Sequence, residues 1–321
     1  MDISNFSRNI SKGEWDNHID FLANESVKNA TKEKIHSSLV DYIDRNVSNE
    51  NFGVLLSGGI DSSLIARICQ LKQCNFRCFC VGIDGSKDII YAQKVAKSLG
   101  LELIVRVYNY NEVEKLLKKA VTILPKPVIE GDNYTEYIVK VTVSAVLLGS
   151  LSLGNENIFL SGIGAEELFA GYQRHQKAID GGGEWRGQPI EDIDKESISG
   201  LKRMHNLVYL RDRSISLNLS KSIVAPYLSN NVIIQAMNID KDQKIDNLNN
   251  KKVLRELALD LGIPEEFSYR KKKGAQYGSG FDKAISKLAK LNKFNFKKRY
   301  LESLVKSITV SYTHLTLPTK S

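Results

Sequence analysis

Residues 54–63 read VLLSGGIDSS, and this stretch decides the fold prediction. The apolar run before Ser57 is typical of a buried strand, and IDSSLIARICQL after Gly59 is typical of a helix. A strand that turns through two glycines into a helix N-terminus presents backbone N–H groups to phosphate. No Lys-Ser or Lys-Thr pair follows, as it would in a P-loop. We therefore expect hydroxyls and amides to hold phosphates and Asp61 to take a magnesium ion; a ligand-free tight turn is the alternative.

The same alternation of strand and helix continues along the chain. Apolar runs between turn residues predict strands, and apolar positions at helical spacing predict helices. The predicted strands are 52–56, 76–83, 101–107 and 157–161, and the predicted helices are 32–47, 61–72, 88–100, 111–124, 135–153 and 165–172. This order predicts an α/β fold, a doubly wound, Rossmann-like parallel sheet with helices on both faces and a C-terminal helical region. Ligands of such sheets bind beyond the carboxyl ends of the strands.

A second turn of the same kind lies in FLSGIGAEELFAGYQRH at 159–175. An apolar strand leads into Ser161-Gly162, and the helix that follows begins with two carboxylates, Glu166 and Glu167. Two strand ends of one parallel sheet that both present Ser-Gly and an acid would face one pocket. Phosphates at the first turn and magnesium ligands at the second make a consistent site for ATP.

Four segments follow from these patterns. Residues 1–28 are polar with little periodicity, and we interpret them as a loosely attached arm. Residues 29–175 form the α/β nucleotide-binding core, and residues 176–305 continue it as a helical region. The glycine-rich stretch 178–189 in that region is typical of a flexible loop or lid. Residues 306–321 end in VSYTHLTLPTKS, which we interpret as part of a non-native or disordered tail.

Composition and charge indicate a globular protein of the cytoplasm. Of the 321 residues, 42% are hydrophobic and 26% are charged, as in ordinary globular chains. No apolar run approaches the roughly 18 residues that span a bilayer, and the N-terminus has no signal-peptide core. We therefore expect a cytoplasmic protein without membrane contacts. From Arg270 onward the chain has 13 Lys and Arg against 2 Asp and Glu, which favours a solvated helix face, with nucleic-acid contacts as the alternative.

The four cysteines all fall within twelve residues, at positions 69, 74, 78 and 80. Their spacing does not match the usual pairs of zinc ligands. Cys78 and Cys80 would share one face of a buried strand. We expect small buried thiols rather than a metal or redox site.

The two turns together resemble a known family. SGGIDSS resembles the loop of the N-type ATP pyrophosphatases, the PP-loop superfamily, and SGIGAEELFAGYQRH is similar to a segment of the synthetase domain of asparagine synthetases. LRDRSISLNLSKSIVAPYLS at 210–229 and KKVLRELALDLGIPEEFSYRKKKGAQYGSG at 251–280 are similar to later segments of that domain. The resemblance covers about residues 50–280. It implies an adenine nucleotide alpha-hydrolase-like fold and a ligase that adenylates a carboxylate, aspartate or a related acid, with ATP-Mg and amidates it with ammonia.

The resemblance also implies a role for each matching residue. Those expected in catalysis are Asp61, Glu167, Lys272 and Lys273. Those expected to hold ATP are Ser57, Gly58, Gly59, Asp61, Ser62, Ser63, Val81, Gly82, Ser161 and Gly162. The magnesium ligands are expected to be Asp61, Glu166 and Glu167.

Several positions depart from the pattern of asparagine synthetases. Ile163 replaces a glutamate thought to assist the attacking ammonia, and isoleucine cannot accept a proton. Ser222, Val224 and Ser229 replace the family's Glu, Arg and Asp, and no arginine occurs at 130–145. Asp2 follows Met1, whereas the family begins with a glutaminase domain. We expect this domain to be absent, with ammonia free or delivered by a separate glutaminase subunit.

Two other functions stay open at the level of sequence. A tRNA-modifying PP-loop enzyme is favoured by the basic C-terminal segment and the cysteines. A non-catalytic nucleotide-binding homologue is favoured by Ile163. The partners we expect are a small carboxylate substrate and ammonia, and a homo-oligomer is left open.

Overall fold

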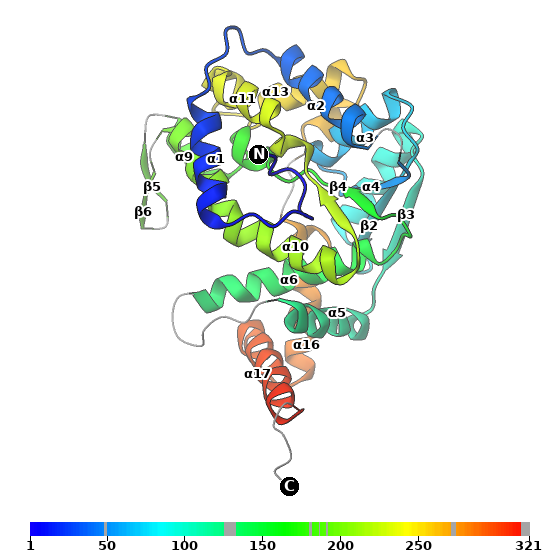
Figure 1. The fold of residues 1–321 in the computed structure, drawn as a ribbon. Coiled ribbons are helices and arrows are strands. Elements are labelled where there is room, and N and C mark those ends of the chain that lie inside the picture. Colours follow the sequence, from blue (N-terminus) through cyan, green and yellow to red (C-terminus); the bar gives the residue numbers. More distant parts are fainter. Residues whose placement is uncertain are drawn as a thin grey trace.

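A five-stranded parallel sheet forms the centre of the fold (Figure 1). The computed structural model describes residues 1–47, 50–124, 133–179, 182–185, 187–190, 192–270 and 274–315. The strand order is β3-β2-β1-β4-β7, and the strands are β1 Phe52–Leu55, β2 Phe76–Gly82, β3 Leu103–Val107, β4 Ile158–Leu160 and β7 Ser222–Val224. This topology confirms the predicted doubly wound sheet. The order reverses between β1 and β4, the two strands that carry the Ser-Gly turns, and ligands bind at such switch points.

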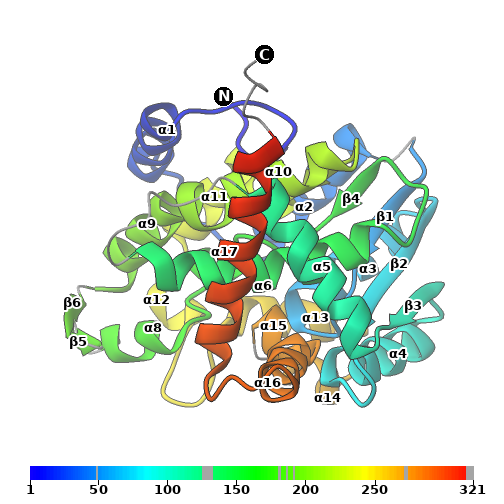
Figure 2. The same cartoon turned by 90° about the horizontal axis from the view of Figure 1, so that it is seen from below.

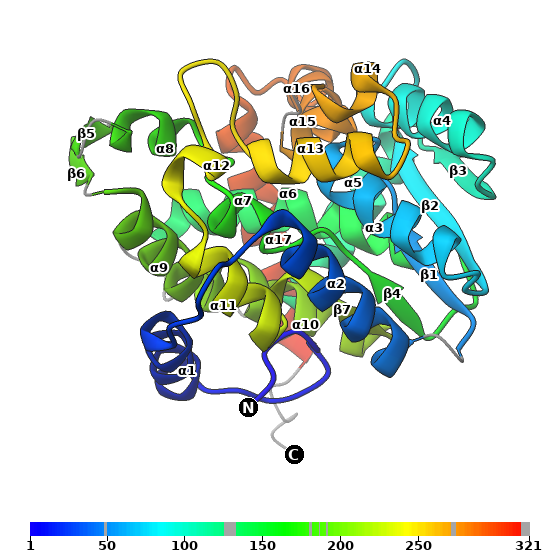
Figure 3. The ribbon, with the colours of Figure 1, turned by 90° about the horizontal axis from the view of Figure 1, so that it is seen from above.

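Helices cover both faces of the sheet, as Figures 2 and 3 show from opposite sides. One layer contains α2 Lys32–Asn46, α3 Ile60–Leu71, α4 Lys87–Leu99 and α13 Lys252–Asp260. The other contains α5 Tyr110–Ile123, α6 Asn133–Leu151 and α10 Leu210–Asn218. One cluster of buried apolar side chains runs through the molecule from Ile3 to Val305. Burial of the sheet on both faces explains why its central strands read as nearly continuous apolar runs.

The N-terminal segment differs from the predicted loose arm. It forms helix α1 Lys12–Asn24, which begins with a capping box between Ser11 and Glu14. The side chains of Ile3, Phe6 and Trp15 are fully buried, and the Trp15 indole N–H donates to the carbonyl of Leu201 at 2.9 Å. Because Leu201 lies 186 positions further along the chain, the pattern of the segment itself did not reveal the packing.

The region after residue 172 is mostly helical, as predicted, but includes three short strands. β5 Gly183–Trp185 and β6 Gln188–Ile190 pair antiparallel and overlap the predicted loop 178–189, and β7 joins the central sheet. A strand of three residues has too few positions to show a period, so β7 was not predicted. The remaining elements are α7 Ala165–Leu168, α8 Gln173–Ala178, α9 Ile193–Met204, the π-helix η1 His205–Tyr209, the 3₁₀-helix η2 Pro226–Leu228, α11 Asn230–Asn238, α12 Lys241–Lys244, α14 Glu265–Ser268, α15 Ala275–Gly278, α16 Phe281–Leu291 and α17 Lys297–Leu315.

The C-terminal helices lie against α5 and α6. Lys283, Lys287 and Lys290 on α16 are exposed, which fits a solvated face. Helix α17 continues to Leu315, into the segment 306–321 that we predicted to be a non-native or disordered tail. Three of the four cysteines are buried, and all four are free thiols. Among the described residues, no helix combines the length and the apolar character needed to cross a membrane.

Candidate active site

The first Ser-Gly turn joins β1 to α3. Gly58 has φ +66°, and a Cβ there would lie 2.5 Å from the backbone carbonyl carbon of Tyr91, so the turn requires glycine. The Ser62 hydroxyl accepts a hydrogen bond from the Ser57 N–H at 3.2 Å and donates to the Gly59 carbonyl at 3.2 Å. These contacts fold the loop over the N-terminus of α3, where backbone N–H groups attract an anion.

The second Ser-Gly turn follows β4, the neighbour of β1 in the sheet. The Ser161 N–H donates to the carbonyl of Val224 on β7 at 2.9 Å, which fixes the start of the turn. A Cβ on Gly162 would lie only 2.8 Å from the Cβ of Asp61. The two turns are therefore packed directly against each other, as expected for adjacent strand ends at a switch point.

Both turns open into one cleft of ≈ 870 Å³. Among the predicted site residues, those that line it are Ser57, Asp61, Ser62, Val81, Ser161, Gly162, Glu166 and Glu167. Ser63 is 1% exposed and does not line the cleft, nor do Gly58, Gly59 and Gly82. Gly82 instead permits close packing, because a Cβ there would lie 2.8 Å from the carbonyl oxygen of Ser279. Lys272 and Lys273 lie outside the described residues.

Asp61 and Glu166 converge on the ammonium group of Lys251. The Lys251 Nζ lies 2.8 Å and 2.7 Å from the two carboxylate oxygens of Asp61 and 2.8 Å from Oε1 of Glu166. Lys251 is 4% exposed. Burial by itself would lower the pKa of Lys251, but the charges and hydrogen bonds of the two carboxylates outweigh it and raise that pKa. Sequence reasoning missed Lys251, since nothing near it in the chain marks it as a partner of Asp61.

Glu167, predicted as both a catalytic and a metal-binding residue, has a different environment from Glu166. It is buried and accepts a hydrogen bond from the Tyr172 hydroxyl at 2.7 Å. Burial raises the pKa of Glu167, although the Tyr172 hydrogen bond acts in the opposite direction. Tyr172 also lines the cleft, and the guanidinium of Arg174 lies over its ring at 4.7 Å. Of the two neighbouring glutamates on α7, Glu167 is thus hydrogen-bonded to Tyr172, whereas Glu166 binds Lys251.

Arg270 is a second buried cation beside the first turn. Its guanidinium donates to the Ser57 carbonyl at 2.9 Å and to the Asp88 carboxylate at 3.2 Å. It also lies over the ring of Tyr91 at 3.9 Å from the centroid. The sequence placed Arg270 in a basic run but gave no sign that it reaches the loop. Its contacts hold the Ser57 carbonyl, so Arg270 shapes the proposed phosphate-binding turn without lining the cleft.

The donor set of the cleft fits magnesium bound together with a nucleotide. In such sites magnesium is held by one or two carboxylates, phosphate oxygens and water. Asp61 and Glu166 already share one cation, so their oxygens reach a common point. The part of the chain that the structure describes has no group of three or more His, Cys, Asp and Glu side chains that could hold a metal. A magnesium ion held by Asp61 and Glu166 would take its other ligands from ATP phosphates and water.

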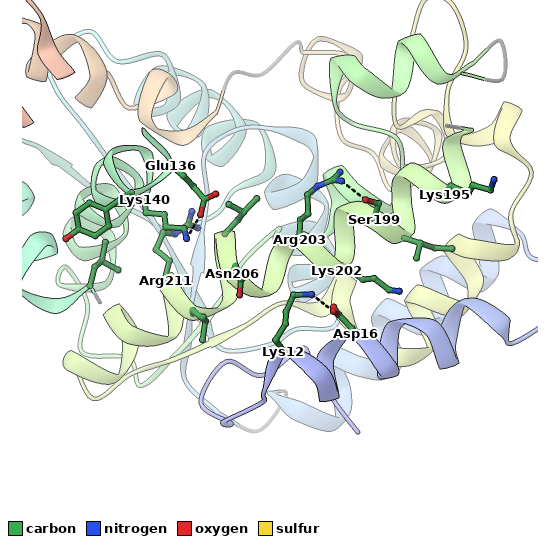
Figure 4. A pocket seen from close by; sticks show the side chains of 15 residues that line it. Lys12, Asp16, Glu136, Lys140, Lys195, Ser199, Lys202, Arg203, Asn206 and Arg211 are labelled. Carbon is green, nitrogen blue, oxygen red and sulfur yellow. Dashed lines mark hydrogen bonds and ion pairs between the residues drawn. The ribbon is translucent and has the colours of Figure 1, made fainter. Parts of the chain in front are cut away.

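A second cavity of ≈ 770 Å³ lies along α9, η1 and α10, facing α1 and α6 (Figure 4). Many of the side chains that line it are basic, including Lys12, Lys140 and Lys202. These three form ion pairs with Asp16, Glu136 and Asp20 respectively. Because the charges are compensated locally, we assign no ligand to this cavity.

Comparison with known proteins gives a consistent family. The sequence model described as asparagine synthase matches residues 34–202 and 186–302. The Methanocaldococcus jannaschii protein named "Putative asparagine synthetase (glutamine-hydrolyzing) 1" is 29% identical over 321 aligned positions, covering 86% of this chain and 56% of its own length. Asparagine synthetase (glutamine-hydrolyzing) 2 of Lotus japonicus is 27% identical, covering 74% of this chain and 41% of its own. The chain therefore spans about half the length of the curated relatives it matches.

Solved structures give more distant matches. NMN synthetase from Francisella tularensis aligns with a TM-score of 0.41 and 12% identity, covering 91% of this chain and 98% of its own. An ammonia-dependent NAD synthetase from Campylobacter jejuni aligns with a TM-score of 0.36 and 16% identity, covering 90% and 99%. At these scores the likeness carries no argument about the site.

Proposed function

This chain belongs to the asparagine synthase family, and from that premise we propose that it is an ATP-dependent carbon–nitrogen ligase. In this proposal it adenylates a carboxylic acid, transfers the acyl group to ammonia, and releases AMP and pyrophosphate. The observation that carries the proposal is the contact between the two Ser-Gly turns, where Gly162 packs on Asp61 and both residues line one cleft. This contact supports the proposal because backbone suited to phosphate and carboxylates suited to magnesium would then serve one site.

The first step transfers the adenylyl group. A carboxylate oxygen of the acid attacks the α-phosphorus of ATP, and the bond from that phosphorus to the bridging oxygen breaks, so that pyrophosphate leaves. Backbone N–H groups at the start of α3 and the hydroxyls of Ser57 and Ser62 would stabilise the charge that develops on pyrophosphate. Magnesium, when bound by Asp61 and Glu166, would neutralise part of the same charge.

The second step forms the amide. The lone pair of ammonia attacks the acyl carbon, the carbon–oxygen bond to AMP breaks, and AMP leaves with that electron pair while a proton passes to solvent. The residue in the cleft at the position of the family's glutamate is Ile163, which cannot take this proton. Free ammonia, or ammonia from a separate glutaminase subunit, is the nitrogen source that we propose.

The acid itself is aspartate or a related carboxylate in this proposal. Two cations of the cleft wall could meet a substrate carboxylate, and both already have carboxylate partners. The Nε of Arg174 lies 3.1 Å from Glu196, and Arg211 binds Asp212 through two contacts of 2.5 Å and 2.9 Å. Because recognition of a second carboxylate would have to compete with these pairs, a related acid with one carboxylate is a serious alternative to aspartate.

The test is to identify the nucleotide product from ATP and magnesium by chromatography, with the acid and ammonium each present or withheld. AMP and amide that appear only with aspartate and ammonium would establish asparagine synthesis. AMP formed with another acid would keep the ligase and change its substrate. Pyrophosphate exchange into ATP with a panel of acids reports the first step alone.

The matched variants are Asp61→Asn and Asp20→Asn. Asp61→Asn removes a carboxylate that lines the cleft and contacts Lys251, and turnover should fall at least a hundredfold. Asp20→Asn removes a surface carboxylate paired with Lys202, and turnover should stay unchanged. If no nucleotide turns over with any acid, with ammonia or with a glutaminase partner, the chain is a non-catalytic nucleotide-binding homologue and the proposed function is refuted.

A further inference from the structure

Lys251, Asp61 and Glu166 form a cluster of charged side chains around one buried ammonium group. A lysine removed from water loses a large hydration energy, which only close opposite charges can offset. Lys251 has two such partners, because both oxygens of Asp61 and one oxygen of Glu166 lie within 2.8 Å of its Nζ. Asp61 lies in the first turn of α3 and Glu166 in the first turn of α7, the two helices that follow the Ser-Gly turns. The ammonium therefore joins the two halves of the cleft.

The backbone around Lys251 is fixed in an unfavourable conformation. Lys251 has φ +54°, a left-handed value that is costly for a residue with a side chain. Its N–H donates to the Phe169 carbonyl at 3.1 Å, and the Asn250 side-chain amide donates to the Gly171 carbonyl at 2.7 Å. Arg255 in turn donates to the Asn250 carbonyl at 2.6 Å. Such strain persists where the surroundings require it, often at functional sites.

Gly171 leaves the space that the ion pair occupies. A Cβ on Gly171 would lie 1.9 Å from Oε2 of Glu166 and 2.4 Å from Cε of Lys251. The atoms that it would meet belong to flexible side chains and not to backbone. Substitution by alanine would therefore displace the Glu166–Lys251 pair while leaving both charges present.

We propose that Lys251 is a positioning residue that makes magnesium binding depend on the nucleotide. Without ATP, its ammonium occupies the two carboxylates that the metal needs, so magnesium alone binds poorly. With ATP, phosphate oxygens supply both further metal ligands and negative charge to balance the ammonium. The metal therefore enters as a complex with ATP. The inference rests on the proposed use of ATP and magnesium at this site.

Two physical effects disfavour the binding of magnesium in the absence of ATP. Magnesium gives up its water ligands reluctantly, and two carboxylates already engaged by an ammonium offer little in exchange. Repulsion between the ammonium and a divalent ion a few ångströms away adds to that cost. Replacement of Lys251 by methionine removes both obstacles, because methionine has similar length and no charge.

Lys244 provides the matched control. Its side chain is fully buried, and its Nζ lies 3.0 Å from the Asp194 carboxylate, but neither residue lines the cleft. Lys244→Met should destabilise the fold as the loss of a buried cation does, without altering the response to magnesium.

The experiment measures magnesium binding by isothermal calorimetry and by thermal unfolding, in MgCl₂ alone and in MgCl₂ with ATP. The wild type and Lys244→Met should bind magnesium measurably only with ATP. Lys251→Met should bind magnesium without ATP at least tenfold more tightly than the wild type, and MgCl₂ alone should raise its unfolding temperature. Gly171→Ala should show a smaller gain in the same direction, and it keeps the test available if Lys251→Met does not fold.

Two results would overturn the inference. One is a wild type that binds magnesium alone as tightly as Lys251→Met does, and the other is an equal change in Lys244→Met. Both readouts work without turnover, so they separate this inference from the proposed function. If the protein makes no AMP but shows the lysine-dependent magnesium response, the proposed ligase activity is refuted and the proposed role of Lys251 is supported.

Discussion

Replacement of His175 by asparagine should reduce the loss of folding stability that occurs as the pH falls. His175 is fully buried, and its Nδ1 accepts a hydrogen bond from the Tyr172 N–H at 3.2 Å. Burial, with nearby cations such as Arg174, lowers the pKa of His175 from 6.5 to about 3. The folded protein therefore keeps this ring neutral while the unfolded chain binds a proton below pH 6.5.

The size of the effect follows from linkage. A lowered pKa in the folded state gives stability that is present above pH 6.5 and is lost as the pH falls toward 3. Each pH unit in that window costs about 1.4 kcal/mol. Between pH 8 and pH 5 the wild type should lose about 2 kcal/mol through His175 alone. Asparagine can accept the same Tyr172 hydrogen bond and does not titrate, so this loss should disappear in the variant.

The assay is equilibrium unfolding in urea at pH 8, 7, 6 and 5, followed by far-ultraviolet circular dichroism. The quantity compared is the slope of unfolding free energy against pH, since the variant also loses packing at every pH. His36→Asn serves as the control, because burial also lowers the pKa of His36 but that ring is only partly buried. Its slope should change less. Equal slopes in wild type and His175→Asn would refute the reasoning and show that His175 titrates near its ordinary pKa despite its burial.

Two further substitutions test the contacts around the first turn. Arg270→Met removes the guanidinium that donates to the Ser57 carbonyl and pairs with the buried Asp88. Urea unfolding should show that the free energy of unfolding falls by about 3–5 kcal/mol, and fluorescent ATP analogues should bind more weakly. Arg270→Lys should recover part of the stability, and a full loss with lysine would show that the positive charge is not what stabilises the turn. Gly162→Ala should weaken ATP binding at least tenfold, because the new Cβ would displace Asp61. Gly13→Ala is the control and should leave ATP binding unchanged, because no atom lies within 4 Å of its new Cβ. Unchanged ATP affinity in Gly162→Ala would mean that the contact between the turns does not shape the nucleotide site.

The sequence predicted the elements whose signals are local. β1 and α3 were predicted to within a residue or two because an apolar run, two glycines and a helical period occur within about twenty positions. The sequence also predicted that the two Ser-Gly turns lie together, because parallel strand ends meet at one edge of a sheet, but it did not identify the contact between Gly162 and Asp61. The burial of Trp15 was not, since its partner Leu201 belongs to a helix far along the chain. Strand β7 was missed because three residues carry no period.

The site residues that were missed share one physical cause. The loop SGGIDSS lacks the lysine with which a P-loop grips phosphates, and the sequence near it offers no replacement. In the structure two cations reach the loop from a distant segment. Lys251 binds Asp61 across 190 positions of sequence, and Arg270 binds the Ser57 carbonyl across 213. Each is buried, so the packing of distant segments determines where its charge lies, and no local sequence pattern reveals that position. A loop without its own cation is then a reason to search the late helices of a chain for buried lysines and arginines, because the phosphates that such a loop binds require positive charge from somewhere in the fold.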